Sequence, residues 1–143
     1  MTRVKLAGMA ALLLLAALFA VIGVTRYLDD AVSPVVQVIG CADIVRGCNG
    51  DGLRVRMDRA PEIMRPFMLE VQAERADTIE ASFQMAGMEM GFNRYRLQRQ
   101  DGGVWQAEVT LPICVRGRKD WLLLLEVHAG QAQKQVAVPF STR

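Results

Sequence analysis

Residues 67–73 read FMLEVQA, and residues 79–85 read IEASFQM. In each stretch an apolar side chain returns at every second position, beginning with Phe67 in the first and Ile79 in the second. Successive side chains of a β-strand point to opposite faces of its sheet, so this alternation predicts strands with one buried and one wet face. These two stretches decide the fold class, because a helix would need a period of 3.6 residues.

The same alternation occurs in residues 53–57 (LRVRM) and 105–111 (WQAEVTL). Less regular apolar runs predict further strands, and turn residues separate the runs. We therefore expect an all-β antiparallel sandwich of about seven to eight strands over residues 35–143. The almost continuous apolar run at 121–127 predicts a central strand, and Pro139 predicts that the last strand lies at an edge or ends there. The further strands are expected at residues 35–39, 92–98, 121–127 and 133–140.

Strand order along the chain also predicts which loops meet. If successive strands run antiparallel, loops alternate between the two ends of the sandwich. We take the first expected strand, at residue 35, to start from a membrane to which the N-terminus is anchored. Counting strands from there places Met64, residues 85–90 and Cys114 at the membrane-proximal end. It places Cys41, Cys48 and His128 at the opposite end.

The N-terminus carries an apolar run of nineteen residues, 6–24, without a charge. This is close to the roughly 20 residues that span a bilayer as a helix. Arg3 and Lys5 precede the run and favour a cytoplasmic N-terminus. We expect an uncleaved transmembrane anchor at residues 1–27 and a linker at 28–34, with a cleaved signal peptide as the alternative. Either case places residues 35–143 outside the cytoplasm.

The charge balance of the external part narrows the choice of partner. Three of the 17 basic residues, Arg3, Lys5 and Arg26, precede residue 28, which leaves 14 basic and 15 acidic residues. Binding to nucleic acid requires a concentrated basic surface, so this near-neutral domain argues against it. Nucleophile-elbow, P-loop, zinc-protease and dinucleotide-binding motifs are absent from the sequence. We therefore expect neither an enzyme nor a small-molecule substrate.

Three cysteines in an oxidising compartment predict one disulfide and one remaining thiol. Cys41 and Cys48 bracket a single loop, so this pairing is favoured among the three that are possible. Cys114 would then be the remaining thiol, either as a small buried apolar residue or as a soft ligand.

Residues 85–91 read MAGMEMG and place three methionines in a loop framed by glycines. Met85 continues the alternation of its strand, which predicts a core position. Met88 and Met90 have three alternative roles: packing over the open end of the sandwich, binding Cu(I) together with Cys114 or Met64, or lining a docking surface. The single histidine, His128, excludes a histidine-rich zinc or Cu(II) site within one chain.

Residues 83–91 read FQMAGMEMG, and they are followed by residues 93–97 of a predicted strand and by GVW at 103–105. Together with the anchor and the external β domain, this segment resembles the FixH-like and YtkA-like families of membrane-anchored periplasmic proteins. The resemblance covers roughly residues 67–128. It implies an immunoglobulin-like sandwich and a non-enzymatic accessory role in copper handling or in the assembly of haem–copper respiratory oxidases. The partner it implies is a respiratory oxidase or a copper chaperone, met at the bacterial inner membrane. A structural or protein-interaction module without a metal role is the alternative.

Overall fold

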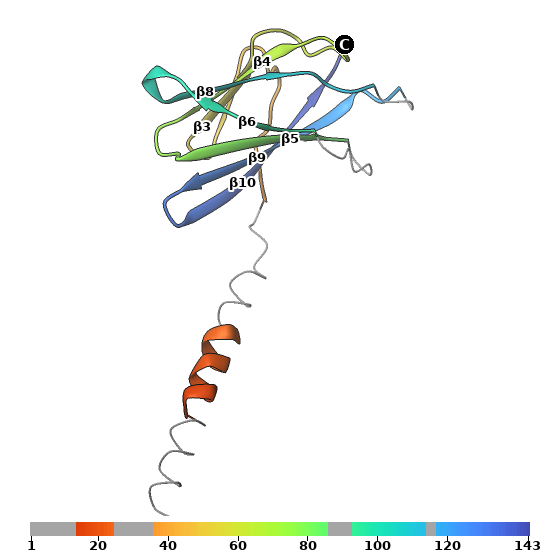
Figure 1. Ribbon diagram of the computed structural model, residues 1–143. Coiled ribbons are helices and arrows are strands. Elements are labelled where there is room, and N and C mark those ends of the chain that lie inside the picture. Colours follow the sequence, from red (N-terminus) through yellow and green to blue (C-terminus); the bar gives the residue numbers. More distant parts are fainter. Residues whose placement is uncertain (1–13, 25–35, 86–92, 114–116) are drawn as a thin grey trace, which may run out of the picture. The chain divides into compact units, whose positions relative to one another are not determined.

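The computed structural model describes residues 14–24, 36–85, 93–113 and 117–143 (Figure 1). The chain divides into two units, Met1–Ser33 and Pro34–Arg143. The boundaries expected after residues 27 and 34 fall within residues 25–35, outside the described part of the chain.

The first unit contains a helix at residues 14–24, and all eleven of these residues are apolar. Their side chains are exposed, with Leu14 at 72% and Phe19 at 69%. Among the described residues, no helix is both long and apolar enough to cross a membrane. The expected span, residues 6–24, begins before the described helix, so the anchor stays a prediction.

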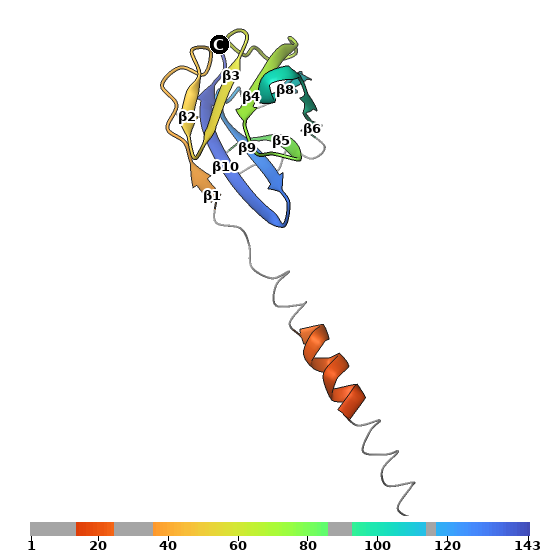
Figure 2. The same ribbon diagram turned by 90° about the vertical axis from the view of Figure 1, so that its left-hand side faces the viewer.

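The second unit contains two five-stranded sheets that pack face to face (Figures 1 and 2). Sheet A has the strand order β1-β10-β9-β5-β6, and sheet B has the order β2-β3-β4-β8-β7. This arrangement confirms the expected all-β sandwich. The strands are β1 (Val36–Val38), β2 (Cys48–Gly50), β3 (Leu53–Met57), β4 (Phe67–Ala73), β5 (Thr78–Gln84), β6 (Arg94–Arg96), β7 (Gln98–Arg99), β8 (Val104–Val109), β9 (Asp120–Ala129) and β10 (Ala132–Ser141), with the short 3-10 turn η1 (Asp101–Gly103) before β8.

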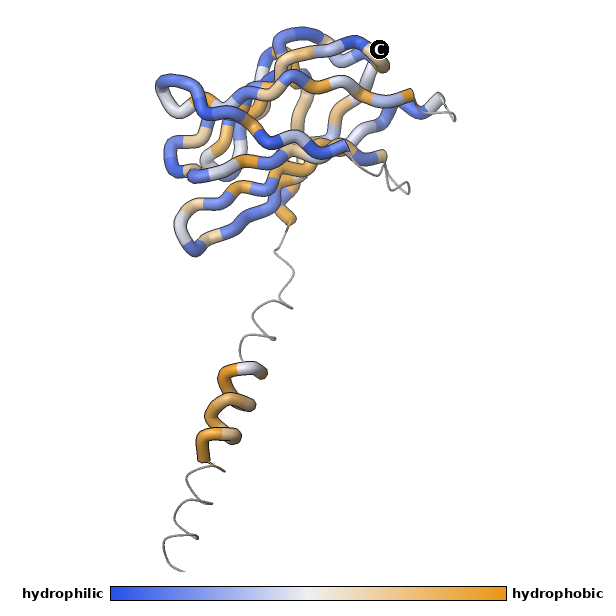
Figure 3. Tube along the Cα trace, viewed as in Figure 1, coloured by the Kyte–Doolittle hydropathy of each residue, from blue (hydrophilic) through white to orange (hydrophobic). Residues whose placement is uncertain are grey.

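The core consists of the inner faces that the alternation predicted, and hydrophilic and hydrophobic residues alternate along most strands (Figure 3). Phe83 lies near its centre and makes edge-to-face contacts with Phe67, Tyr95 and Phe140 at centroid distances of 6.2, 5.9 and 6.1 Å. Such aromatic pairs add to the stabilisation that area burial provides. The fully buried side chains come from both sheets and include Met57, Leu69, Val71, Val109, Ile79, Leu123, Leu125 and Val136.

The described residues contain ten strands, so the expected count of seven to eight is wrong. Strand β2 was missed because three residues ending in glycine show no alternation. The single strand expected at 92–98 is divided at the buried residue Leu97, where the chain leaves sheet A and enters sheet B. The expectation of a wholly antiparallel sandwich also needs correction, because β1 pairs with β10 in parallel.

The sheet order places β9 and β10 in the interior of sheet A. Strand β9 lies in the interior of sheet A, between β10 and β5, which confirms a central strand. Strand β10 is not an edge strand, but β1 pairs only with residues 135–137 of it. Pro139 lies beyond that overlap, two residues after Ala137, whose carbonyl accepts the Ile39 N–H. The backbone nitrogen of Pro139 therefore faces the same side, where β1 has ended, and its missing N–H breaks no ladder.

On each side of the sandwich, a segment of the chain passes from sheet A to sheet B. Leu97 links β6 to β7 on one side and donates its backbone N–H to the Ile79 carbonyl at 2.9 Å. On the other side, Ile39 follows β1 and packs against Gly50 at the end of β2. A Cβ at Gly50 would lie 2.8 Å from Cγ1 of Ile39, so only glycine fits there without a shift.

The extra strand β2 inverts the expected assignment for every loop that follows it, so the expected position of Met64 at the end where β1 begins is wrong, and so is the expected position of His128 at the opposite end. Strands β1, β3, β5, β8 and β10 all run toward one end, which we call the loop end. Its described residues are 39–47, 58–66, 85, 93, 110–113, 117–119 and 142–143. Met64 and Cys41 therefore share an end, and the expectation that they lie at opposite ends is wrong. His128 lies toward the other end, and β1 begins from that other end.

Candidate functional site

Backbone hydrogen bonds hold the separate segments of the loop end together. The Met64 N–H donates to the Leu111 carbonyl at 2.9 Å, and Ile63 forms a bridge with Leu111. The C-terminal residues add two backbone hydrogen bonds. The Thr142 N–H donates to the Lys119 carbonyl at 3.0 Å, and the Arg143 N–H donates to the Pro61 carbonyl at 3.2 Å. Met64 thus lies beside the strand end that leads, three residues later, to Cys114.

Met64 itself has an unusual conformation. Its φ is +61°, in the left-handed region that L-residues rarely adopt, and it is 59% exposed. The nearby residue Ile113 is 65% exposed. The described part of the loop end therefore presents two large apolar side chains to solvent.

The predicted Cu(I) ligands Met88, Met90 and Cys114 all lie outside the described residues, which omit 86–92 and 114–116. The described neighbours of the methionine segment are well placed in the fold. Met85 is buried, as the alternation predicted, and the Phe83 N–H donates to the Asn93 carbonyl at 3.2 Å. This bond joins the two strand ends from which residues 86–92 extend.

Cys41 and Cys48 form a disulfide with a Cα–Cα distance of 5.2 Å, which confirms the predicted pairing. Asp43 shapes the loop between them, because its carboxylate accepts the N–H of Val45 at 2.9 Å and its carbonyl accepts the N–H of Gly47 at 3.2 Å. Gly47 has φ +99°, which suits glycine. With both sulfurs bonded to each other, the pair is not a thiolate metal site.

A pocket of about 770 Å³ lies at the loop end, between the disulfide loop and the C-terminal residues. Buried Ile44, Trp121 and Phe140 contribute to its walls, and the indole Nε1–H of Trp121 has no partner within the described residues. Asp120 also lines it, and a hydrogen bond from Arg118 at 2.9 Å lowers the pKa of Asp120. Sequence reasoning missed this pocket because it placed Cys41 at the opposite end from residues 112–119.

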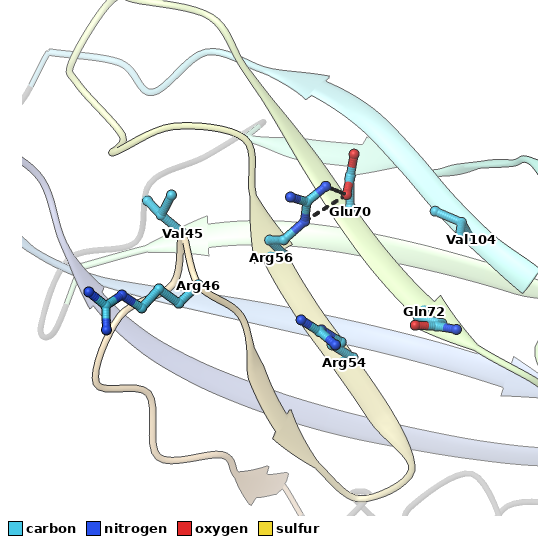
Figure 4. A pocket seen from close by; sticks show the side chains of 7 residues that line it. All are labelled: Val45, Arg46, Arg54, Arg56, Glu70, Gln72 and Val104. Carbon is cyan, nitrogen blue, oxygen red and sulfur yellow. Dashed lines mark hydrogen bonds and ion pairs between the residues drawn. The ribbon is translucent and has the colours of Figure 1, made fainter.

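A second hollow lies on the outer face of sheet B, and Figure 4 shows the side chains that line it. We call it the arginine groove; its volume is about 330 Å³. Arg56 donates from Nε to Glu70 at 2.9 Å, and Gln106 donates to the other oxygen of the same carboxylate at 3.1 Å. The alternation of β3 marked its arginines only as outward-facing, so no signal in the sequence pointed to this groove. Its lining residues are Val45, Arg46, Arg54, Arg56, Glu70, Gln72 and Val104.

The residues that the structure describes contain no group of three histidine, cysteine or acidic side chains able to hold a metal ion. His128 pairs with Thr78 and Gln133 in sheet A, toward the end opposite Met64.

No protein-family model matches the chain, and a search of curated proteins also found no match.

Proposed function

We propose that this chain is a non-enzymatic accessory protein of the bacterial inner membrane, anchored by residues 1–27, with its β-sandwich in the periplasm. Its role would be in the assembly of a respiratory haem–copper oxidase or of another copper site, and the loop end would meet the partner. The observation that carries this proposal is Met64, an exposed thioether held in left-handed backbone beside Leu111. A strained, exposed residue is a reason to ask for a function.

An immunoglobulin-like type of sandwich is part of the proposal. The order of β4, β8 and β7 in sheet B and of β10, β9, β5 and β6 in sheet A supports it. The parallel pairing of β1 with β10 supports it further, since a first strand of this fold can pair with the last. The additional hairpin of β2 and β3 is a departure from the simplest form of that fold.

The metal in this proposal is Cu(I), bound by Met88, Met90 and Cys114. Thioether and thiolate sulfur are soft ligands that suit Cu(I). Two described contacts support convergence of these segments: the Met64–Leu111 bond, close before Cys114, and the Phe83–Asn93 bond, which flanks residues 86–92. Met64 is a fourth candidate sulfur ligand, and it lies at the loop end beside Leu111.

The test is an anaerobic Cu(I) titration of the full chain in detergent, against a chelator of known affinity. The Met88→Leu/Met90→Leu variant keeps apolar bulk and removes two sulfurs, so we expect affinity to fall at least tenfold. Met68→Leu is the matched control, because Met68 lies on β4 in sheet B. Equal affinities of the wild type and the double variant would remove these two methionines from the site.

A docking module without a metal is the second candidate, favoured by the exposure of Ile113 and Met64 at one end. Leucine at positions 64, 88 and 90 preserves an apolar surface without thioether sulfur. If membranes from cells with this triple variant retain oxidase activity, the docking module is supported. If activity falls to the level of a deletion strain, while the variant is still made in normal amount, the copper role is supported.

A further inference from the structure

The arginine groove contains two cross-strand pairs that differ in one respect. Arg54 and Arg56 lie on the outward face of β3, opposite Gln72 and Glu70 of β4 respectively. Arg56 has a carboxylate opposite it and forms an ion pair with it. Arg54 has an uncharged amide in the equivalent place, and the two side chains lie on neighbouring strands in Figure 4. The described residues give Arg54 no ion pair.

The backbone beside Arg54 leaves space for its guanidinium group. A Cβ at Gly47 would lie 3.2 Å from Nε of Arg54, so a larger residue there would press on the guanidinium group. The positive φ of Gly47 also disfavours other residues. Arg54 therefore lies at the wall of the groove, directly beside Gly47.

The charges of the groove favour an anion. Three arginines line it, and Glu70 is its only acidic lining residue among those described. Both oxygens of that carboxylate already accept hydrogen bonds, from Arg56 and Gln106. Arg46 is paired with Asp43 at 3.4 Å, but its side chain is 88% exposed, so this pair is weak.

We propose that the arginine groove binds a carboxylate from an extended acidic segment of a protein partner. The ligand carboxylate lies over the outer face of sheet B between Arg54 and Gln72, and it supplies the charge that Glu70 supplies to Arg56. Arg54 donates two hydrogen bonds to it, as planar guanidinium groups do to carboxylates, and the Gln72 amide donates a third. Val45 and Val104, which also line the groove, contact apolar residues that flank the acidic one. This site lies on the outer face of sheet B and does not rest on the function proposed for the loop end.

The test uses the full chain in detergent and a fluorescently labelled five-residue peptide of alternating valine and glutamate. Fluorescence anisotropy gives the dissociation constant, and the same peptide with glutamine in place of glutamate is the ligand control. We expect Arg54→Gln to weaken binding of the glutamate peptide at least tenfold, since a charge-assisted bidentate contact is lost. Arg96→Gln, which removes the same charge from sheet A, should leave binding unchanged.

Gln72→Glu provides a second, independent variant. This substitution places a carboxylate of the chain itself opposite Arg54, so we expect it to abolish peptide binding. Circular dichroism should show that the fold of the variant is unchanged. Equal losses in Arg54→Gln and Arg96→Gln would overturn the proposal, because they would show attraction to net charge alone. Binding of the glutamine peptide as tight as that of the glutamate peptide, absence of binding by the wild type, or equally tight binding of inorganic phosphate at Arg54 would overturn it too.

Discussion

The hydroxyl group of Tyr95 makes two hydrogen bonds to the backbone of Thr110, donating to its carbonyl at 2.9 Å and accepting from its N–H at 3.2 Å. Tyr95 belongs to β6 of sheet A, whereas Thr110 follows β8 of sheet B. One side chain therefore joins the two sheets at the loop end and binds the backbone just after β8.

Tyr95→Phe should lower the free energy of unfolding by about 1–2 kcal/mol, because both hydrogen bonds are lost while the ring remains packed on Phe83. Urea denaturation of the wild type and the variant measures this difference. Thr110→Ala is the matched control, since the bonds involve only the backbone of Thr110, and it should be nearly neutral. An equal loss in both variants would mean that the hydroxyl is not the cause.

Reduction of the Cys41–Cys48 disulfide, or Cys41→Ser/Cys48→Ser, should destabilise the domain by about 2–3 kcal/mol, as expected for a short closed loop. The measurement is the urea midpoint with and without reductant. Reductant should have no effect on the midpoint of the double variant. Ellman titration of the denatured, unreduced wild type should find one thiol per chain, and three would contradict the bond.

Met64→Gly should raise the free energy of unfolding by about 0.5–1 kcal/mol, because glycine adopts φ near +60° without the steric cost of an L-residue. Met64→Ala retains that cost and should give no gain, which makes it the control. Thermal unfolding followed by circular dichroism compares the three proteins. A gain of the same size with alanine would locate the effect in the side chain instead.

Asp58 connects the end of β3 to β4, because its Oδ1 accepts a hydrogen bond from the Met68 N–H at 2.8 Å. Its Oδ2 accepts a second hydrogen bond, from the Arg59 guanidinium group at 2.8 Å. Burial alone would raise the pKa of Asp58, but the hydrogen bonds from Arg59 and the Met68 N–H together outweigh it and lower the pKa. The ionised form therefore stabilises the fold above the unfolded-state value of 3.8, and this contribution is lost as pH falls through the lower folded-state pKa.

Asp58→Asn should consequently be less stable than the wild type at neutral pH, by up to about 1 kcal/mol, and the difference should vanish in strong acid. Urea midpoints across this pH range test the sign. A deficit that grows as pH falls would show that the pKa of Asp58 is raised in the folded state.

Gly50→Ala should destabilise the domain by about 1–3 kcal/mol through the contact of the new methyl group with Ile39. In an Ile39→Ala background the same change should cost less, because the clashing side chain is gone. A double-mutant cycle by urea denaturation measures this coupling. Additive losses would mean that the two strand ends do not touch in solution.

The sequence predicted those strands in which a pattern of apolar and polar residues repeats. Alternation in residues 67–73 and 79–85 identified the strands and their buried faces, since each strand carries the same signal several times. The disulfide was predicted because both cysteines flank one loop. Strand β2 is three residues long and has no repeat to detect, and its omission placed Met64 at the end where β1 begins, opposite Cys41.

The candidate sites were harder to predict for a related reason. The neighbours Arg54 and Gln72 belong to different strands, and only the register between β3 and β4 brings them together. Local patterns contain no information on register beyond the choice of the buried face. The left-handed backbone of Met64 likewise depends on its bond to Leu111, far along the chain.

The parallel pairing of β1 with β10 also constrains biosynthesis. Val36 pairs with Gln135, so β1 finds its partner strand only after residue 135 has been synthesised. Until then sheet A has an unpaired edge, and Val36 and Val38 have no partner strand. Non-local pairing of this kind slows folding and leaves strand edges open to other chains. A nascent chain that stalls before residue 135 would therefore be a substrate for chaperones or proteases, however complete sheet B already is.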